Sequence, residues 1–289
     1  MKRVLITGSS GFIGSHLVEA MTDFEIYQWD RNQGDLKLPQ DFPEVDIVIH
    51  LAAFNSTKDF YLKGFDVIRD NILTTLNLLE HYRNQETKPL FIYTGTPEAI
   101  TGATDYFGYK IPTDEECPAV IDDVKNIRWS YAGSKLLGEQ SVVASGLDYV
   151  IIRPNNIYGP RQKNHFVDEF IDRLRNGDRE LYGWQNTRSW LYIDDFVDAF
   201  TQLIFKEEAK NDIFNIGSND ETEVIVLAEK IAELLDINPS EIVRKDAPEG
   251  SAKRRMPDIT KLKNITGWEP KINLEDGLAK TVRWHLELK

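Results

Sequence analysis

A tyrosine and a lysine four residues apart, Tyr131 and Lys135, form a pair of side chains in this sequence that could do chemistry. In a helix, residues at this spacing lie on one face, so the ammonium group would lie beside the phenol. A nearby cation stabilises the phenolate and lowers the phenol pKa from its ordinary value of about 10. The pair therefore predicts a tyrosine that exchanges a proton with a substrate near neutral pH.

The same spacing occurs a second time, at Tyr106 and Lys110. Gly108 lies between these two residues and Pro112 follows them, so a helix is not expected to continue as far as Lys110. The segment that contains Tyr131 instead opens a plausible helix, which continues as Lys135-Leu136-Leu137-Gly138-Glu139-Gln140. We therefore assign the acid/base role to Tyr131, with an ordinary surface helix as the alternative interpretation.

A glycine-rich turn follows the short apolar run from Val4 to Thr7 and precedes a predicted helix, Ser15 to Met21. Glycine permits a tight turn and lets the backbone approach a pyrophosphate, which would bind the amides at the start of the helix. The strand before and the helix after are the context that this motif requires. Five residues are candidate cofactor ligands: Gly8, Gly11, Phe12, Ile13 and Gly14.

An acidic residue, Asp30, ends the second predicted strand about twenty residues further along, where a carboxylate accepts hydrogen bonds from ribose hydroxyls. NAD is therefore the expected cofactor. Arg31 follows directly and could pair with a 2′-phosphate, so NADP is the alternative. An ordinary polar turn is the third interpretation of this stretch. Asp35 and Leu36, which come next, are included in the predicted cofactor site.

The chain as a whole is acidic, with a net charge of -13 and an isoelectric point near 4.9. This balance argues against non-specific binding to nucleic acid or to a membrane surface, which needs a basic face. A diphosphate ligand would need local positive charge. The second half of the chain offers four arginines for it, with solvated surface charge as the alternative interpretation: Arg161, Arg188, Arg254 and Arg255.

The elements that must position these residues alternate between short β-branched runs and helical periodicity. Between the third and fourth runs lies an amphipathic helix, Asn71 to Glu80. This rhythm predicts an α/β fold with a doubly wound parallel sheet. Five runs are expected to be buried strands: Val4–Thr7, Glu25–Trp29, Ile47–Leu51, Leu90–Thr94 and Tyr149–Arg153.

After Pro154 the pattern loosens, and glycine- and arginine-rich loops mix with helices such as Val224 to Leu235. We predict a dinucleotide-binding domain over residues 1–155, to which residues 190–217 return. Residues 156–189 and 218–289 are predicted to form a smaller, C-terminal substrate-binding lobe.

Cys117 is the single cysteine of 289 residues, so no intramolecular disulfide and no thiolate metal cluster is expected, and a reducing cytoplasm fits. No run approaches the roughly 18 apolar residues that span a membrane. The five histidines lack metal-ligand spacing. We expect no metal, and we interpret His50, at a strand end, as structural.

Several motifs in order along the chain resemble the extended short-chain dehydrogenase/reductase family, the NAD-dependent nucleotide-sugar epimerases and dehydratases. The resemblance covers nearly the whole sequence. Its motifs are Gly8/Gly11/Gly14, His50-Leu51-Ala52-Ala53, Tyr131 to Lys135 with Gly138-Glu139, Arg153 to Arg161, Arg188 to Asp195, and Gly267 to Pro270.

The resemblance implies a Rossmann domain that holds NAD, with Leu51, Ala52 and Ala53 in the cofactor site. It implies Tyr131 as base, Lys135 on the nicotinamide ribose, and a serine or threonine that orients the sugar hydroxyl. Thr96 occupies this last position. Hydride would leave sugar C4 and give a transient 4-ketone.

The implied substrate is a nucleotide-diphosphate sugar. The resemblance places Arg188 and Arg255 on the phosphates, with Asn156 nearby, and Arg161 is included as a substrate-binding candidate. Arg255 fits better than its neighbour because the family pattern has aspartate three residues later, here Asp258. A homodimer paired through the helices near residues 71–82 and 131–145 is also implied.

The stretch Thr96-Pro97-Glu98 decides between reactions. In family dehydratases an acid stands between the threonine and the glutamate and protonates the leaving hydroxyl, whereas Pro97 donates no proton. Glu98 is a candidate base beside the 4-ketone, and an acid that interacts with backbone amides at a helix start is its alternative.

Epimerisation is the favoured outcome. The alternatives are a UDP-glucuronate decarboxylase, which the stretch Lys125 to Tyr131 resembles, an NDP-hexose 4,6-dehydratase, an NAD(P)H-dependent 4-keto-sugar reductase, and a non-catalytic NAD-binding protein.

Overall fold

The computed structural model describes residues 1–247 and 251–287. Its centre is a six-stranded sheet in which every neighbouring pair is parallel. The strands lie in the order β2-β1-β3-β4-β5-β10. Their bounds are β1 (Arg3–Thr7), β2 (Glu25–Trp29), β3 (Ile47–His50), β4 (Leu90–Thr94), β5 (Tyr149–Pro154) and β10 (Asp212–Ile216).

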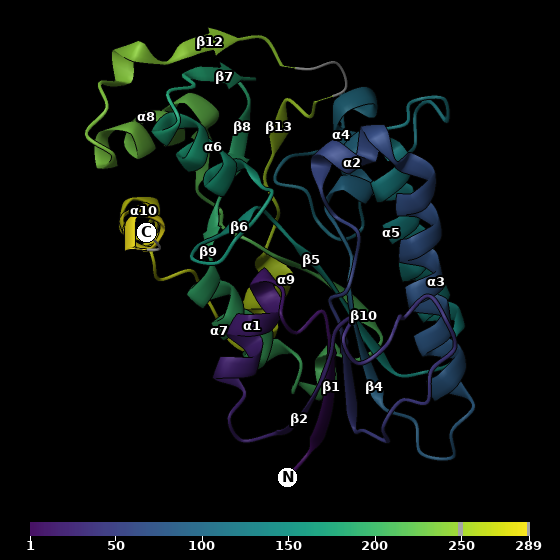
Figure 1. The fold of residues 1–289 in the computed structure, drawn as a ribbon. Coiled ribbons are helices and arrows are strands. Elements are labelled where there is room, and N and C mark those ends of the chain that lie inside the picture. The colour runs from purple at the N-terminus through teal and green to yellow at the C-terminus, as the bar shows by residue number, and fades with distance from the viewer. Residues whose placement is uncertain (248–250, 288–289) are drawn as a thin grey trace.

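Both faces of this sheet are covered by helices (Figure 1). Along β1, Val4 and Ile6 pack into one core, while Leu5 packs into the other. One core includes side chains from α1 (Phe12–Ala20), α7 (Ile193–Leu203) and α9 (Thr260–Thr266). The other includes side chains from α3 (Gly64–Arg83) and α5 (Trp129–Ala144). The predicted doubly wound α/β architecture is therefore confirmed.

The chain winds outward from β1 in both directions, since β2 pairs with one edge of β1 and β3 with the other. In open α/β sheets, ligands bind at such a switch point, outside the carboxyl ends of the strands. Three predicted site segments follow these ends directly: Gly8 follows β1, Leu51 follows β3, and Thr96 lies two residues after β4.

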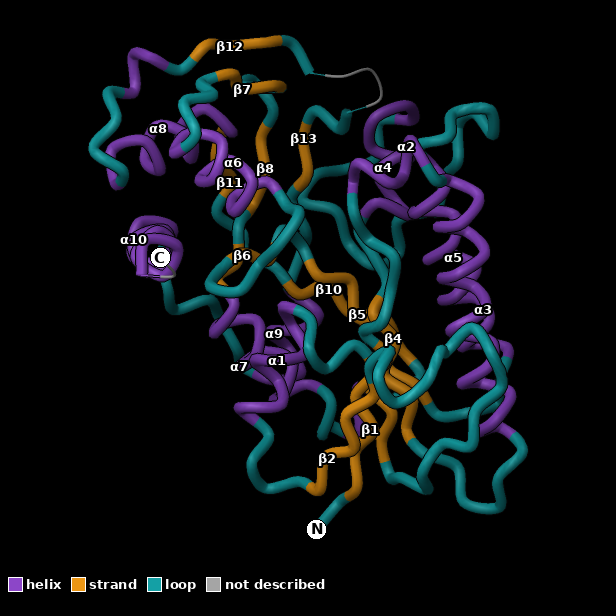
Figure 2. Tube along the Cα trace, in the orientation of Figure 1, coloured by secondary structure: helices purple, strands orange, loops and turns teal. Residues whose placement is uncertain are grey.

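The second lobe lies beyond this end of the sheet (Figure 2). It contains a three-stranded sheet in the order β11-β8-β13 and two two-stranded sheets, β12-β7 and β6-β9. Its elements are β6 (Ile157–Tyr158), α6 (Phe166–Arg175), β7 (Glu180–Tyr182), β8 (Thr187–Ser189), β9 (Leu191–Tyr192), β11 (Glu221–Glu223), α8 (Val224–Leu234), β12 (Val243–Lys245), β13 (Arg254–Arg255) and α10 (Leu274–Glu287), with the short 3-10 helix η2 (Pro239–Glu241). The 3-10 helix η1 (Glu207–Ala209) lies at the opposite end of the central sheet, where Glu207 lines a hollow with Lys2 and Asp46.

Part of the later chain returns to the first domain, since β10 pairs with β5 in the central sheet. The exact division at residues 155/156, 189/190 and 217/218 stays a prediction. The helix predicted from Asn71 lies inside α3, which begins earlier, at Gly64.

Two short helices complete the first domain: α2 (Thr57–Leu62) and α4 (Glu98–Phe107). At the second tyrosine–lysine pair, α4 ends at Phe107 and Gly108 adopts a left-handed conformation with φ 67°. Lys110 therefore lies outside the helix, as the sequence predicts.

Within the described ranges, no helix is long and apolar enough to cross a membrane.

Candidate active site

Tyr131 lies in the first turn of α5, where three contacts fix its position. Its ring stacks on Phe60 of α2, with centroids 4.6 Å apart and an interplanar angle of 8°. The backbone of the same turn is tied to α3, because Asn71 Nδ2 donates to Ser134 Oγ over 3.0 Å and Ser134 Oγ donates to the carbonyl of Tyr131 over 2.7 Å. The phenol is thus held by two neighbouring helices.

Thr96 faces this phenol from the segment that follows β4. A hydrogen bond with the Thr96 side chain favours the phenolate form of Tyr131. The backbone N–H of Glu98 donates to Thr96 Oγ1 over 3.3 Å, which orients the threonine at the start of α4. Thr96 itself is buried. The structure therefore brings Tyr131 and Thr96 together, as required of two groups that share one substrate hydroxyl.

The pKa of Tyr131 is raised, which corrects the sequence-based expectation of a lowered value. Burial is the largest cause, and the nearby Glu98 carboxylate raises the pKa further. Lys135 does not offset these effects in the structure. Its Nζ lies over the ring of Tyr93, 4.5 Å from the centroid. Additional positive charge beside the phenol is needed before Tyr131 acts as a base near neutral pH.

Lys135 is almost fully buried, with 3% of its surface exposed. Burial lowers the pKa of Lys135 to about 8, and the carboxylate of Glu139 opposes this effect. Glu139 is in turn paired with Arg153 of β5 through hydrogen bonds of 3.1 and 2.7 Å. A chain of buried charges therefore connects Lys135 to the central sheet.

The glycine turn forms a cradle that fits a dinucleotide. Gly8 has φ +72°, and a Cβ there would lie 2.9 Å from the backbone nitrogen of Ala52. A Cβ on Gly14 would lie 2.2 Å from the carbonyl oxygen of Gly8. Gly11 caps α1 without any side-chain hydrogen bond, so the amides of the first turn, at Phe12 and Ile13, point out of the helix end. Such amides bind phosphate.

Asp30 lies against this turn. Its carboxylate accepts hydrogen bonds from Ser9 Oγ and, over 3.0 Å, from the backbone N–H of Ser10. The acid at the end of β2 is thus fixed beside the glycines, at the place where a cofactor ribose would lie. Arg31, the basis of the NADP alternative, is exposed.

The remaining cofactor candidates lie on two segments. Leu51 and Ala52 border the glycine turn, because their backbone N–H groups donate to the carbonyl and hydroxyl oxygens of Thr7. Ala53 follows them and is half-buried. Asp35 pairs with Lys37 over 3.6 Å. Leu36 is buried in the core below α3.

Glu98 is the first residue of α4 and pairs with two arginines. Its Oε1 lies 3.3 Å from Arg255 Nη2 and 3.9 Å from Arg128 Nη2. Burial acts to raise the pKa of Glu98, but Arg255, Arg128 and Arg188 together hold it below its ordinary value. The acid is therefore ionised at neutral pH, and it interacts with guanidinium groups rather than with backbone amides alone.

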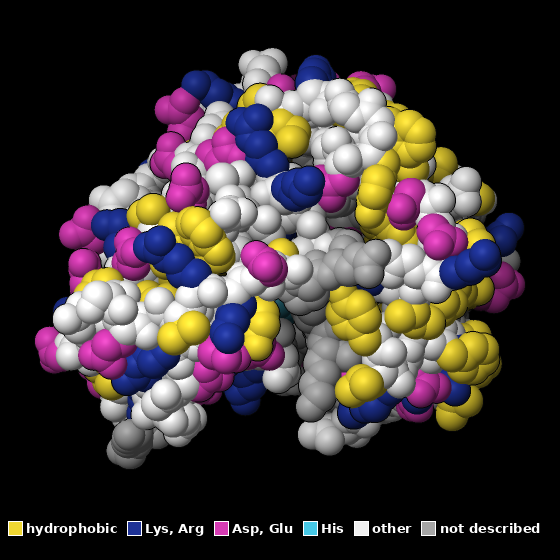
Figure 3. Space-filling view, turned by 90° about the horizontal axis from the view of Figure 1, so that it is seen from above, with side chains coloured by type: hydrophobic (Ala, Val, Ile, Leu, Met, Phe, Trp, Pro, Cys, Tyr) yellow, Lys and Arg dark blue, Asp and Glu magenta, His cyan; other side chains and the backbone are white. Residues whose placement is uncertain are grey.

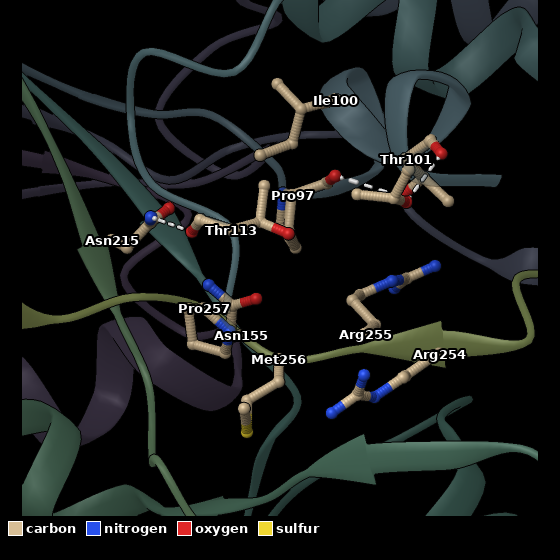
Figure 4. A pocket seen from close by; sticks show the side chains of 11 residues that line it. Pro97, Ile100, Thr101, Thr113, Asn155, Asn215, Arg254, Arg255, Met256 and Pro257 are labelled. Atoms are coloured by element: carbon tan, nitrogen blue, oxygen red, sulfur yellow. Dashed lines mark hydrogen bonds between the residues drawn. The ribbon is translucent and has the colours of Figure 1, made fainter. Parts of the chain in front are cut away.

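The four predicted arginines separate into two groups. Arg188 lies in the cluster around Glu98, and its guanidinium donates to backbone carbonyls, including that of Ala252 over 2.6 Å. Arg254 is paired with Glu221 through bonds of 2.6 and 2.7 Å. Arg255 and Arg254 extend in different directions from β13 (Figure 4). Of the two, it is Arg255 that joins Arg188.

Arg161 is not brought to this cluster, since it pairs with Glu19 of α1 through bonds of 2.6 and 2.8 Å. Asn156 adopts φ 42° and donates over 2.8 Å to the carbonyl of Ser189, the residue after Arg188. It therefore lies close to the strand that carries Arg188.

Two residues of this site were missed from the sequence. Arg128 precedes Tyr131 by three residues, so helical spacing was the available signal for its proximity. Phe60 had no such signal, because α2 was not predicted.

His50 is buried between the hydroxyls of Thr7 and Thr75 at 2.8 and 3.1 Å. Burial lowers its pKa to about 3, and this places a neutral imidazole between strand and helix.

Among residues 1–247 and 251–287, no group of three or more His, Cys, Asp or Glu side chains is arranged to hold a metal. The site offers instead a phenol, a hydroxyl, a buried ammonium and a cluster of guanidinium groups. These suit proton exchange with a sugar alcohol beside a bound dinucleotide.

Comparison with known proteins gives a family match over most of the chain. The model of the "NAD dependent epimerase/dehydratase family" matches residues 4–217. A UDP-N-acetyl-alpha-D-glucosaminuronate decarboxylase of Bacillus cytotoxicus is 31% identical, and the alignment covers 100% of this chain and 99% of the relative. A putative UDP-glucose 4-epimerase of Methanocaldococcus jannaschii is 29% identical, with 97% of each chain covered.

A similar solved structure is that of a UDP-glucose 4-epimerase of Thermotoga maritima with UDP-glucose. It superposes with a TM-score of 0.86 at 28% identity, and 99% of each chain is covered. The fold is therefore shared from end to end.

Proposed function

The chain belongs to the NAD-dependent epimerase/dehydratase family, whose members include nucleotide-sugar epimerases, dehydratases and decarboxylases. From this premise we propose that it epimerises a nucleotide sugar at C4, through a transient 4-ketone. The observation that carries the proposal is the pairing of Tyr131 with Thr96 at the carboxyl ends of the strands, beside the buried Lys135.

Tyr131 takes the proton of the C4 hydroxyl and later returns it, while Thr96 holds the same oxygen by a hydrogen bond. The glycine turn, Asp30 and the Leu51–Ala53 segment would hold NAD, which would supply a reversible hydride acceptor for C4 and, in its oxidised form, a positive charge. Lys135, whose Nζ lies over the ring of Tyr93, is proposed to bind the nicotinamide ribose. Phe60 keeps the phenol ring in one orientation during both transfers.

Inversion at C4 is supported over elimination of water by the residues after Thr96. Pro97 has no proton to give to a leaving hydroxyl. Glu98 is engaged with Arg255 and Arg128 and has a lowered pKa, which makes it a weak base. Inversion needs neither group, because Tyr131 performs both proton transfers.

Decarboxylation of a 6-carboxylate sugar is the second candidate. A 4-keto uronate is a β-keto acid, so it loses carbon dioxide without a leaving-group acid. Arg128 favours this candidate because it adds a guanidinium 3.9 Å from Glu98, whose carboxylate acts on Tyr131, and a sugar carboxylate would need such a cation. The 31% identical relative, named a UDP-N-acetyl-alpha-D-glucosaminuronate decarboxylase, supports the same candidate.

The proposed ligands follow the predicted sites. The glycine turn, Asp30 and the Leu51–Ala53 segment are proposed to hold NAD, with Asp35 and Leu36 beside them. The fit is supported by the two glycines at which a Cβ would meet backbone atoms. Arg188, Arg255 and Asn156 are proposed to bind the diphosphate of the substrate. Arg161, which pairs with Glu19 of α1, is proposed to bind the substrate from the side of the second lobe that faces α1.

A homodimer is proposed through α3 and α5. Apolar side chains are exposed on both helices, among them Phe65, Leu76 and Val143. Figure 3 shows hydrophobic side chains gathered on the side of the molecule where α2 and α3 lie.

Cys117, a free and buried thiol, fits a reducing compartment, and the cytoplasm is the proposed location.

A product survey tests the proposal. The NAD-loaded protein is incubated separately with UDP-glucose, UDP-N-acetylglucosamine, dTDP-glucose and UDP-glucuronate, and products are resolved by mass and by sugar proton NMR. Unchanged mass with an inverted C4 proton coupling is the expected result. Loss of carbon dioxide would establish the second candidate, and loss of water would contradict both. Tyr131→Phe is the matched control for adventitious conversion.

A further inference from the structure

The ion pair between Glu98 and Arg255 connects the two parts of the molecule. Glu98 begins α4 in the first domain, and Arg255 lies on β13, whose strand partner β8 carries Arg188. In Figure 4, Arg255 extends from β13 toward α4. All three side chains of the contact, including Arg128, are largely buried, with 21%, 14% and 13% exposed for Glu98, Arg255 and Arg128. Water therefore screens this contact weakly.

The contact with Arg255 is loose compared with those of the other arginines of the lobe. Arg254 and Arg161 each bind a carboxylate through two bonds of 2.6 to 2.8 Å. Arg255 reaches Glu98 through one bond of 3.3 Å. Its Nε is buried and has no hydrogen-bond partner among the described residues. A planar guanidinium binds phosphate with two parallel donors, so Arg255 has unused capacity for such a ligand.

The charges around Glu98 are also unbalanced. Three guanidinium groups, on Arg128, Arg188 and Arg255, act on this one carboxylate. Asp105, two turns further along α4, faces the same three arginines but is exposed. The cluster thus keeps a positive excess in an otherwise acidic protein, and a second anion is attracted to the same guanidinium groups.

We infer that Glu98 is an internal counter-anion, which competes with a substrate phosphate for the guanidinium groups of Arg255 and Arg128. The inference rests on the proposed function in that the phosphate is taken to be part of a nucleotide sugar. It makes Glu98 a positioning residue rather than the base that removes a proton from sugar carbon. It also adds Arg128 to the phosphate-binding residues.

The competition sets the affinity for the diphosphate. When the phosphate binds, Glu98 gives up its bond to Arg255, and part of the binding free energy is spent on breaking that pair. An uncharged isostere at position 98 removes this cost. Loss of Arg255 removes the phosphate ligand itself. The two changes break the same ion pair, yet they act on phosphate affinity in opposite directions.

The test measures binding of inorganic pyrophosphate to the NAD-loaded protein by titration calorimetry, because pyrophosphate carries the diphosphate without nucleobase or sugar. Glu98→Gln is expected to bind pyrophosphate about threefold to tenfold more tightly than the wild type, the range for one long charge-assisted hydrogen bond. Arg255→Gln is expected to bind it more weakly by at least the same factor. Asp105→Asn is the matched control and is expected to stay within about twofold.

An affinity in Glu98→Gln that equals or falls below the wild-type value would overturn the inference. A purely structural ion pair predicts this result, because both single variants would then disorder the cluster and weaken binding. If Glu98→Gln does not fold, Glu98→Asp decides the question. It keeps the charge but withdraws it from Arg255 by one methylene, so it is expected to bind pyrophosphate more tightly than the wild type, and failure to do so overturns the inference.

The kinetic split separates positioning from catalysis. With a substrate identified by the product survey, Glu98→Gln is expected to lower KM and to keep kcat within about threefold, whereas loss of a catalytic base lowers kcat by about a hundredfold or more. The outcome of the pyrophosphate titration, unlike that of the kinetic test, does not depend on the proposed function. A protein that converts no nucleotide sugar but binds pyrophosphate in the expected order would reject the proposed function alone.

Discussion

The buried charge of Lys135 is expected to lower the free energy of unfolding of this protein. Lys135 is nearly completely buried on α5, and burial lowers its pKa from the ordinary value of 10.5 to about 8. Replacing Lys135 by methionine keeps a side chain of similar length and removes the buried charge. We predict that Lys135→Met abolishes activity and at the same time raises the free energy of unfolding near pH 7.

The magnitude follows from the pKa. A lowering of the pKa from 10.5 to about 8 corresponds to about 3 kcal/mol at about 1.36 kcal/mol per pKa unit. Below pH 8, where the folded state keeps Lys135 charged, the free energy of unfolding is lower by about this amount. The contact of Nζ with the Tyr93 ring, 4.5 Å from its centroid, returns about 1 to 2 kcal/mol. The net gain of Lys135→Met near pH 7 is therefore about 1 to 2 kcal/mol.

The pH dependence has a defined sign. Between about pH 8 and pH 10.5 the unfolded chain binds more protons at Lys135 than the folded chain does, so wild-type stability rises with pH in this window. The Lys135→Met variant lacks this contribution. Its advantage over the wild type should shrink by about 2 kcal/mol between pH 7 and pH 9.5.

Urea unfolding of NAD-free samples at both pH values measures these differences, and a circular dichroism spectrum checks the fold. Lys206→Met, at an exposed lysine, is the matched control and should show no pH-dependent difference from the wild type. If Lys135→Met is less stable than the wild type near pH 7, or if its stability changes with pH as the wild type's does, the buried charge of Lys135 does not destabilise the fold.

Three further predictions concern neighbouring features. Gly14→Ala should lose retained NAD, measured by absorbance after denaturation, because its Cβ would lie 2.2 Å from a backbone oxygen; normal NAD content would contradict the cradle. Arg153→Met should lower the free energy of unfolding in urea by about 3 to 5 kcal/mol, since it leaves the buried Glu139 carboxylate unpaired; a loss below about 1 kcal/mol would count against it. Phe60→Ala should lower kcat about tenfold with NAD retained, because Tyr131 loses its stacking partner; unchanged kcat would show that the stacking does not position the phenol.

Sequence patterns predicted the strands well because the central sheet is covered on both faces. β2 and β4 have the predicted bounds, and β1, β3 and β5 differ by one residue at one end. β1, β3, β4 and β5 are short runs whose apolar residues enter one of two cores, and this physical demand is visible in composition alone. The expectation that β2 is buried is wrong, because β2 is an edge strand and its residues are exposed or half-buried. The start of α3 was harder, because Phe65 and Ile68 are exposed and blur the helical pattern.

Contacts between distant segments could not be predicted in the same way. Glu98 and Arg255 are 157 residues apart in sequence, and Arg161 and Glu19 are 142 apart. Nothing in the local pattern of an arginine indicates which carboxylate it will meet. The sequence identified the arginines as a class, while the fold decides which of them gather near Glu98.

The pKa of Tyr131 was mispredicted for a related reason. Helical spacing places Lys135 on the same side of α5, but it contains no information on burial or on the nearby carboxylate. Burial and Glu98 raise the phenol pKa in the structure. A spacing rule therefore proposed the residue as a site candidate without describing its electrostatics.

Proton exchange at Tyr131 coupled to return of a hydride to C4 underlies the proposed function, and a nucleotide sugar carrying deuterium at C4, which would leave and return as that hydride, tests the two together. The wild type and Tyr131→Phe are incubated with this substrate, and mass spectrometry follows both product and label. The wild type is expected to form product with the deuterium retained, whereas Tyr131→Phe is expected to keep its NAD but to form product about a hundredfold to ten-thousandfold more slowly. Turnover of Tyr131→Phe within about tenfold of the wild type, or loss of the deuterium to solvent, would contradict the proposed function.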